Sequence, residues 1–312
     1  MLDVDEQNLN EKLKILREKL FAAREKRIHP FKDSKILTDW NGLMISALSK
    51  AAQVFEKDRY YLAAEKAVNF IHANLLNKNG RLLHRFKDGE SSFLSNADDY
   101  AFLVQGLLDL YEAGYDSGYL KTAIDLNSNF IKYFWDETNG GFYFTPSDGE
   151  KLLIRQKEIY DGAVPSGNSV AILNLLRIGR ITGKSDYEKK ASLIIKSFSA
   201  MIENSPQAFT QTLVALDFAF GPSKEIIISG RKDLPETKEM LKVLRGKYIP
   251  NKVIIFNSGQ KDLMEIISPL LGEYTTEDNQ TAVYICENYK CNMPLTTAEQ
   301  LRATLKNENV ET

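Results

Sequence analysis

The chain has 312 residues, of which 43% are hydrophobic and 26% charged, a composition typical of a folded globular protein and not of a disordered one. Its formal net charge of −2 gives no electrostatic basis for binding nucleic acid. No run approaches the roughly 18 uncharged apolar residues of a membrane span. The N-terminus is acidic and polar, unlike a secretory signal, so we expect a cytoplasmic protein without a membrane partner.

The first part of the chain is predicted to be helical. Apolar residues at helical spacing predict a helix over residues 9–27 with a broad solvated face. Because the residue before a proline is pushed out of the α region, His29-Pro30 should end this helix. Two more helical patterns follow, at residues 38–55 and 60–76.

A β-hairpin is predicted next, with strands at residues 80–86 and 91–94. Asp88-Gly89 between short apolar runs is a strong signal for a tight turn. The same order of elements then recurs about 60 residues further on, since Asp148-Gly149 repeats the turn. We expect the later helices at 98–114, 119–135, 166–182, 186–202 and 206–220, and the second strand at 141–145.

A repeat of about 60 residues is longer than the roughly 20–50 residues of common solenoid repeats. Helix pairs with interleaved β-hairpins, packed side by side, instead predict a mainly α fold that forms part of an (α/α)6 toroid of helical hairpins. The first helix of each pair has small, weakly charged residues and should lie inside, while the second carries a solvated face. We expect this toroid portion to span residues 1–221.

Strands alternate with helices after Pro222, which predicts a small α/β segment over residues 222–312. Its elements are expected at 225–229, 235–244, 252–256, 263–271, 282–286 and 297–305, followed by a frayed end. The two cysteines of the chain, Cys286 and Cys291, lie in this segment. We expect two unlinked thiols in a reducing compartment; a redox pair or half of a metal site are the alternatives.

Three polar, aromatic-rich segments lead into the expected inner helices. They are Thr38-Asp39-Trp40-Asn41-Gly42, Asn96-Ala97-Asp98-Asp99-Tyr100 and Tyr160-Asp161-Gly162-Ala163-Val164-Pro165-Ser166-Gly167-Asn168-Ser169. Because the units repeat, the N-terminal ends of these helices should converge at one end of the helical layer and form one mouth.

Four carboxylates in the mouth are candidates for acid–base catalysis: Asp39, Asp98, Asp99 and Asp161. Adjacent helix axes lie about 8–10 Å apart, so such carboxylates can approach the roughly 6.5–9.5 Å separation of inverting glycosidases. The alternative is helix capping, which Asp, Thr and Ser favour. Position favours capping for Thr38, Asp98 and Ser166, whereas Asp39 and Asp99 lie one residue further in and keep a pocket role.

Eight more side chains are candidates for binding a small sugar: Trp40, Asn41, Tyr100, Arg155, Glu158, Tyr160, Ser166 and Asn168. The aromatic ones would stack on sugar faces or, alternatively, fill the mouth as core. The asparagines would contact hydroxyl groups or satisfy turn backbone. His84 is the one histidine near the mouth, and a lone histidine is more often a packed or exposed strand residue than a base. We expect no metal and no cofactor.

The segment Lys35-Ile36-Leu37-Thr38-Asp39-Trp40-Asn41-Gly42-Leu43-Met44 resembles the spermatogenesis-associated protein 20 family. Four further segments continue the resemblance in order: Asp98-Asp99-Tyr100-Ala101-Phe102, Gly140-Gly141-Phe142-Tyr143-Phe144, the segment from Tyr160 to Ser169, and Tyr284-Ile285-Cys286. The resemblance implies a thioredoxin-like domain followed by a six-hairpin glycosidase type of toroid, similar also to sugar 2-epimerases. This chain has no Cys-x-x-Cys, so the resemblance implies that it matches the C-terminal part of the family plan. We expect either a C-terminal fragment or a protein whose thioredoxin-like domain and remaining half of the toroid lie on another polypeptide.

Two functions remain open from the sequence. One is a module that binds or processes carbohydrate through its acidic and aromatic mouth. The other is a non-catalytic scaffold that partners a thioredoxin-like domain. Half a toroid would expose apolar helix flanks, and large apolar patches mark interfaces. We therefore expect a homo-oligomer, or a second chain that completes the toroid.

Overall fold

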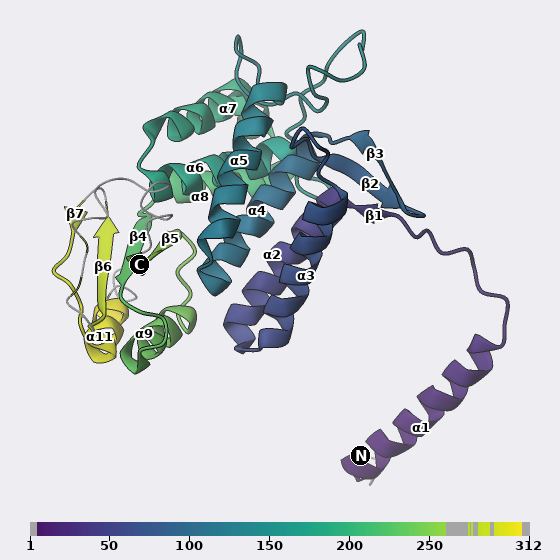
Figure 1. Ribbon diagram of the computed structural model, residues 1–312, viewed down its shortest axis with the longest axis horizontal. Coiled ribbons are helices and arrows are strands. Elements are labelled where there is room, and N and C mark those ends of the chain that lie inside the picture. Colours follow the sequence, from purple (N-terminus) through teal and green to yellow (C-terminus); the bar gives the residue numbers. More distant parts are fainter. Residues whose placement is uncertain (1–4, 260–273, 275, 277–279, 288–289, 308–312) are drawn as a thin grey trace. The chain divides into compact units, whose positions relative to one another are not determined.

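The computed structural model describes residues 5–259, 274, 276, 280–287 and 290–307 (Figure 1). The chain divides into two compact units, Met1–Lys35 and Ile36–Thr312. In the first unit, helix α1 (Glu6–Glu25) is capped by the Asp5 carboxylate, and every residue of α1 is exposed. The helix ends before Pro30, as predicted. None of the helices in the described ranges combines the length and apolar character needed to cross a membrane.

The second unit begins with an array of helical hairpins. They are α2 (Thr38–Phe55) with α3 (Asp58–Asn74), α4 (Ala97–Gly114) with α5 (Ser117–Phe134), and α6 (Gly167–Thr182) with α7 (Ser185–Asn204), followed by the 3-10 turn η1 (Pro206–Ala208) and α8 (Thr210–Phe220). Helices α2, α4, α6 and α8 pack side by side as an inner layer, and α3, α5 and α7 cover them from outside (Figure 1). This arrangement is one sector of an (α/α) toroid, and it confirms the predicted fold class.

The inner helices approach one another closely because of two glycines. A Cβ on Gly42 of α2 would lie 2.5 Å from the carbonyl carbon of Phe102, and one on Gly106 of α4 would lie 2.7 Å from the carbonyl oxygen of Gly42. No side chain fits at either position, so the two backbones touch. Helix α4 is buried along most of its length, so it lies at the centre of the array.

The predicted first β-hairpin is confirmed. Strands β1 (Ile36–Leu37), β2 (Leu83–Lys87) and β3 (Glu90–Leu94) form a small antiparallel sheet in that order. The turn between β2 and β3 places Asp88 and Gly89 at φ values of 52° and 87°, which is the conformation that Asp-Gly tolerates best. Because β1 pairs with β2, the sheet holds the entrance of α2 next to the hairpin.

The predicted strand at residues 141–145 is wrong. Gly140 and Gly141 both have positive φ, 73° and 83°, which is incompatible with an extended strand. The Asn168 side chain then accepts a hydrogen bond from the Phe142 amide and donates one to the Phe142 carbonyl. A side chain of α6 thus satisfies Phe142, while the amides of Tyr143 and Phe144 donate to the Phe134 and Gln156 carbonyls. The spacing of apolar residues alone does not reveal this irregular pairing.

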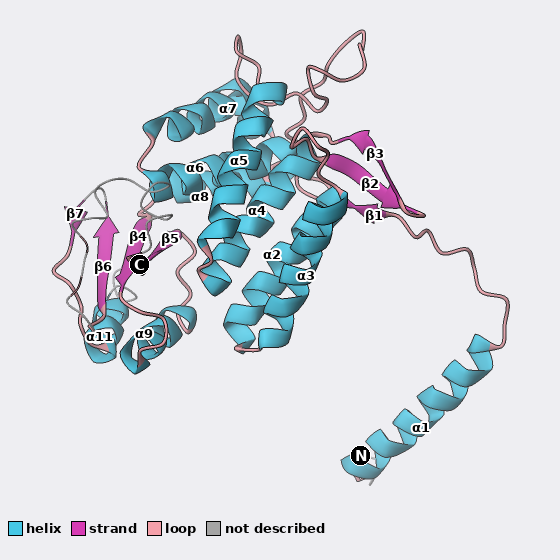
Figure 2. Cartoon of the chain, in the orientation of Figure 1, coloured by secondary structure: helices cyan, strands magenta, loops and turns pink. Residues whose placement is uncertain are grey.

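The rest of the second unit is the predicted α/β segment (Figure 2). Its elements are β4 (Lys224–Ser229), α9 (Pro235–Arg245), β5 (Lys252–Asn257), β6 (Ala282–Glu287), β7 (Lys290–Cys291) and α11 (Ala298–Asn307). The strand order is β5-β4-β6-β7, with β4 parallel to β5 and antiparallel to β6. The helix predicted at 263–271 and most of the frayed end lie outside the described residues.

The sheet of this segment is apolar on both faces. Ile227 and Ile255 join the core of the helical array, whereas Ile226, Ile228 and Phe256 pack with residues of α9 and α11. The predicted boundary between residues 221 and 222 falls between α8 and β4, and division into two domains stays a prediction. The sheet nevertheless shares one of its faces with the hairpins.

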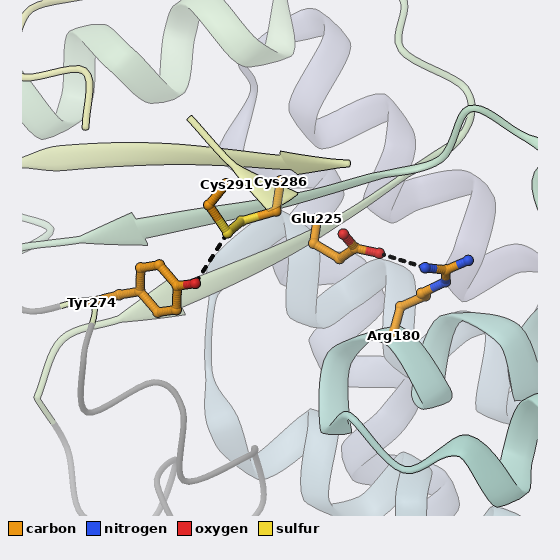
Figure 3. The surroundings of a disulfide bond; sticks show 5 residues. All are labelled: Arg180, Glu225, Tyr274, Cys286 and Cys291. Atoms are coloured by element: carbon orange, nitrogen blue, oxygen red, sulfur yellow. Dashed lines mark hydrogen bonds and ion pairs between the residues drawn. A yellow bond between two sulfur atoms is a disulfide. The ribbon is translucent and has the colours of Figure 1, made fainter. Parts of the chain in front are cut away.

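The expectation of two unlinked thiols is wrong. Cys286 of β6 and Cys291 of β7 lie opposite each other in the antiparallel register and form a disulfide (Figure 3). Cys286 is buried, and the Tyr274 hydroxyl lies 3.0 Å from the Cys291 Sγ. The thiols are linked because β6 and β7 pair with each other. We had predicted no strand after Cys286, and so no pairing that would bring Cys291 next to it. Beside Cys286 on β4, Glu225 pairs with Arg180 of α6 (Figure 3).

Candidate functional site

The N-terminal ends of α2, α4 and α6 converge, as the repeat predicted. The amide of Asp39, in the first turn of α2, donates a hydrogen bond of 3.0 Å to the Asp99 carboxylate of α4. On the other side of α4, a Cβ on Gly167 of α6 would lie only 2.6 Å from the Asp98 Oδ1. Three helix entrances therefore meet around two consecutive aspartates.

Asp99 is the buried hub of this site. Its carboxylate accepts hydrogen bonds from the amides of Asp39 and Asn96, and His84 of β2 places its Nδ1 3.0 Å from both carboxylate oxygens. The Asn96 bond closes the first turn of α4, so Asp99 caps its own helix. A pocket role with free oxygens, which we had kept for Asp99, does not fit these contacts.

The pair of His84 and Asp99 holds a proton. The Asp99 carboxylate, which accepts a hydrogen bond from the imidazole, raises the pKa of His84 above its ordinary value. Burial in turn raises the pKa of the Asp99 carboxyl, although His84 opposes that shift. Both shifts keep the shared proton between imidazole and carboxylate to higher pH than in a free histidine.

Asp98 is a second carboxyl of the site with a raised pKa. Burial, first of all, raises its pKa to about 7, and the neighbouring carboxylates of Asp99, Asp39 and Glu158 add to the shift; the Gly167 amide opposes it. Position had favoured Asp98 as the cap of its own helix, but the cap of α4 is Asn96. Asp99, together with Asn96, thus takes the capping role that position had favoured for Asp98.

Asp39 is the partly exposed carboxylate of the site. Its Oδ1 accepts a hydrogen bond of 2.7 Å from the Trp40 amide, and within the described ranges no group donates to its Oδ2. Asp39, His84 and Asp99 also place one potential ligand atom each within 4.8 Å of one another, a spacing compatible with a metal ion. The Asp99 oxygens already accept three groups, so the hydrogen-bond network accounts for this cluster.

Asp161 has a structural role. Its Oδ1 accepts hydrogen bonds from the Ser166 amide and the Ser169 hydroxyl, and its Oδ2 accepts from the amides of Gln211 and Thr212. The carboxylate therefore ties the loop before α6 to the first turn of α8. Ser166 caps α6 through the Ser169 amide, as predicted.

Several other candidates are also fixed by the fold. Tyr100 is fully buried, and its hydroxyl accepts from Arg81 and from the Leu82 amide, so it is core and not a stacking platform. Thr38 does not cap α2; its hydroxyl donates to the Leu83 carbonyl. Asn41 donates to the Leu37 carbonyl, in line with turn chemistry.

Arg155 lies over the Tyr143 ring and donates to the Thr145 carbonyl, outside the carboxylate group. Asn168 is buried and bonded to Phe142 and to the Glu158 carbonyl. The side chain of Glu158, by contrast, is exposed and close enough to Asp98 to affect its acidity. Trp40 and Tyr160 are 63% and 57% exposed, so both rings are available to a ligand.

Sequence reasoning undervalued His84 and gave no role to Gly167. A histidine one strand away from a predicted acidic helix entrance was the available signal, but only the pairing of β1 with β2 brings it to Asp99. Gly167 permits the contact between α6 and Asp98. The structure thus brings together Asp39, His84, Asp98, Asp99 and Glu158, with Trp40 beside Asp39.

The hairpin array with acidic groups at its inner helix entrances defines a toroid-type helical module. No protein-family model matches the chain. Human spermatogenesis-associated protein 20 is 34% identical over 299 residues, which make up 92% of this chain and 38% of that protein. The chain belongs to the spermatogenesis-associated protein 20 family, and it spans about two-fifths of the length of the curated relatives it matches.

Solved structures show partial likenesses. A cellobiose 2-epimerase from Bacillus thermoamylovorans has a TM-score of 0.46 and 16% identity, covering 55% of this chain and 46% of the epimerase. A GH76 alpha-mannanase from Bacteroides thetaiotaomicron has a TM-score of 0.45 and 19% identity, with the same shares covered.

Proposed function

We propose that this chain binds and processes carbohydrate at the entrances of its inner helices, with Asp98 as the proton donor. The observation that supports the proposal is the raised pKa of Asp98. Burial and the neighbouring carboxylates raise this pKa to about 7. A general acid must keep its proton near the working pH, and sites with paired carboxylates achieve this by separating their acidities.

The other groups of the site suit the same chemistry. Asp39 Oδ2 is available as a second carboxylate oxygen, for a base or for stabilising positive charge on a sugar ring. His84 uses Nδ1 on Asp99 and, among the described residues, has no partner at Nε2, which leaves that nitrogen for a ligand hydroxyl. The exposed rings of Trp40 and Tyr160 offer apolar faces of the kind that stack on sugars.

The test is a glycan-binding, hydrolysis and epimerisation screen on the wild type and on Asp98→Asn. Asparagine keeps the shape and an acceptor for the Gly167 amide but cannot donate the carboxyl proton. We expect binding to persist and turnover to fall by about 10²–10⁴-fold. Asp186→Asn, at an exposed position on α7, is the matched control and should retain full turnover.

A second variant separates binding from chemistry. Trp40→Ala removes an exposed ring without touching the carboxylates, so we expect weaker sugar binding and an unchanged pH dependence of turnover. Absence of sugar binding by both this chain and a full-length family member would rule the proposal out. Turnover by Asp98→Asn at the wild-type rate would remove Asp98 as the proton donor.

A scaffold function is the second candidate, because α2 exposes an apolar stripe. Trp40, Met44 and Val54 are 63%, 56% and 68% exposed, and Ala47 and Ala51 continue the stripe at alternating spacings of four and three residues. Such spacing is that of a helix–helix seam. A second copy of this chain is the partner that we propose for it.

Light scattering on the wild type and on Met44→Glu tests this alternative. We expect a dimer that the variant dissociates, whereas Lys196→Glu on the exposed face of α7 should leave the dimer intact. A monomer across the micromolar range would contradict the scaffold proposal and leave the carbohydrate proposal untouched.

A further inference from the structure

A cavity of about 390 Å³ lies toward the C-terminal ends of the inner helices, at the other end of the layer from Asp98. Its walls come from α2, α4, α6 and α8 and from the segment that leads from α9 into β5. Cavities of roughly 300–1,000 Å³ are the usual size for small-molecule ligands. The mouth residues do not line it, so it is a separate feature of the fold.

The floor of the cavity is an internally paired group of charges. Arg177 of α6 forms ion pairs of 2.8 Å with Asp109 and 2.9 Å with Glu112 of α4, and Lys50 of α2 lies 3.4 Å from Asp109. Burial acts to raise the pKa of Asp109, but Arg177 and Lys50 outweigh it and hold that pKa below its ordinary value. These two carboxylates are therefore already matched by two cations.

Three further cations line the same cavity: Arg245, Lys247 and Lys252. Within the part of the chain that the structure describes, none of the three has a carboxylate at ion-pair distance. Lys252 Nζ donates to the Ile249 carbonyl and Arg245 Nη2 to the Ala113 carbonyl, and the buried Arg245 Nε has no acceptor. The cavity thus contains five cations and two carboxylates.

Lys252 is one of these cations that is partly removed from water. Burial lowers its pKa below the ordinary value, and the nearby cations Arg177 and Lys50 act in the same direction. The Glu112 and Asp109 carboxylates oppose them without reversing the shift. An ammonium group in such surroundings gains more from an added anion than an exposed one does, because less water competes for it. The surplus charge therefore lies where a bound anion is most effective.

The remaining wall is apolar. Val54 of α2, Val214 and Phe218 of α8 and Ile254 of β5 line the cavity, and Tyr248 stands at its edge with 90% of its surface exposed. An inorganic ion would leave these side chains facing water. A ligand with an apolar body covers them while its charged end reaches the cations.

We propose that this cavity binds a small organic anion, with an oxyanion group on Arg245, Lys247 and Lys252 and an apolar body against α2 and α8. Guanidinium and ammonium groups recognise both phosphate and carboxylate. The proposal goes beyond the carbohydrate site and does not depend on it, because the two share no residue.

Calorimetric titration with phenyl phosphate and with benzoate tests the proposal, with benzyl alcohol as the neutral probe of the same body. We expect one of the anions to bind and benzyl alcohol not to bind at about 10 mM. Tighter binding of phenyl phosphate identifies a phosphate ligand and tighter binding of benzoate a carboxylate. No binding of either anion, or equal binding of benzyl alcohol, would overturn the proposal.

Variants locate the binding. Lys252→Gln should weaken binding by about tenfold or more, the usual loss for one charged contact, and Lys247→Gln, at the less buried edge, gives the same test should Lys252→Gln fold poorly. Lys196→Gln on α7 is the matched control and should bind like the wild type. If both cavity variants bind the anion as tightly as the wild type, the anion binds elsewhere and the proposed site is wrong.

Discussion

Helix α4 carries two pairs of acidic residues, one at each end, and the fold treats them in opposite ways. At the N-terminal end, Asp98 and Asp99 face further carboxylates and one histidine, and the pKa of Asp98 rises to about 7. At the C-terminal end, Asp109 and Glu112 share Arg177, and the pKa of Asp109 falls.

The comparison shows that burial alone does not decide whether a carboxyl keeps its proton. Asp99 and Asp109 are 0% and 3% exposed, yet their pKa values shift in opposite directions. The difference is the buried guanidinium, which supplies a permanent charge that histidine does not. One end of α4 thus suits proton transfer and the other suits structural support.

Replacing the Arg177 guanidinium should have the largest effect on the difference between the two ends of α4. Arg177→Met leaves Asp109 and Glu112 buried without their main partner, and breaking such a pair destabilises a protein by about 3–5 kcal/mol. Urea unfolding measures the loss. The matched control is Arg302→Met, whose pair with Glu239 is half-exposed and should change stability by less than about 1 kcal/mol. A small loss in Arg177→Met would mean that this end is not held by charge.

Asp98→Asn tests the N-terminal end of α4 through the pH dependence of stability. Because the folded pKa of about 7 exceeds the unfolded one, wild-type stability falls as pH rises between those values, and the full cost is present above pH 7. The variant lacks this cost. Its stability relative to wild type should therefore grow from near zero at low pH to about 2–4 kcal/mol at pH 8, measured by urea unfolding at several pH values. A pH-independent difference would contradict the protonated state of Asp98.

Gly167→Ala tests the close contact between α6 and Asp98. The new Cβ would lie 2.6 Å from Asp98 Oδ1 and 3.1 Å from the Ala97 carbonyl carbon, so we expect a loss of about 1–3 kcal/mol from overpacking. In the Asp98→Ala background part of that loss should disappear, because the closest atom is gone. Additive effects in the double variant would place the clash on the backbone alone.

His84→Gln gives the smallest expected effect. The pKa of His84 is raised in the folded state, so its stabilising effect is complete below the unfolded value and is lost as pH rises through the folded one. We expect a loss of about 0.5–1 kcal/mol at pH 6 that shrinks at pH 9. His72→Gln, at an exposed position on α3, is the control, and a loss in His84→Gln that grows with pH would contradict the pairing.

The helical architecture was accessible from the sequence because its signals are local. Apolar spacing located the helices, and Asp88-Gly89 located the first hairpin. The prediction of a strand at residues 141–145 was wrong because Gly141 has positive φ and because Phe142 bonds to a side chain of α6, Asn168. The prediction of two unlinked thiols was wrong because the disulfide depends on the register of β6 and β7. No local sequence pattern determines that register.

Only part of the candidate site could be predicted from the sequence. Repetition predicted that the helix entrances converge, but neighbours in sequence could not tell which aspartate of the pair at 98–99 is bonded on all sides. That choice depends on Asn96, His84 and the α2 amide, which come from three different segments. Of the two roles predicted for Tyr100, the structure shows the one in the core, where its hydroxyl accepts a hydrogen bond from Arg81.

The contact between Gly167 and Asp98 has a consequence for the order of events in unfolding. It joins two hairpins, so the share of the raised Asp98 pKa that comes from burial against α6 is present only while α6 remains docked on α4. The proton on Asp98 therefore reports docking without any added label. When α6 leaves before the rate-limiting barrier, the unfolding rate carries the pH dependence of this one carboxyl; when it leaves afterwards, the rate does not.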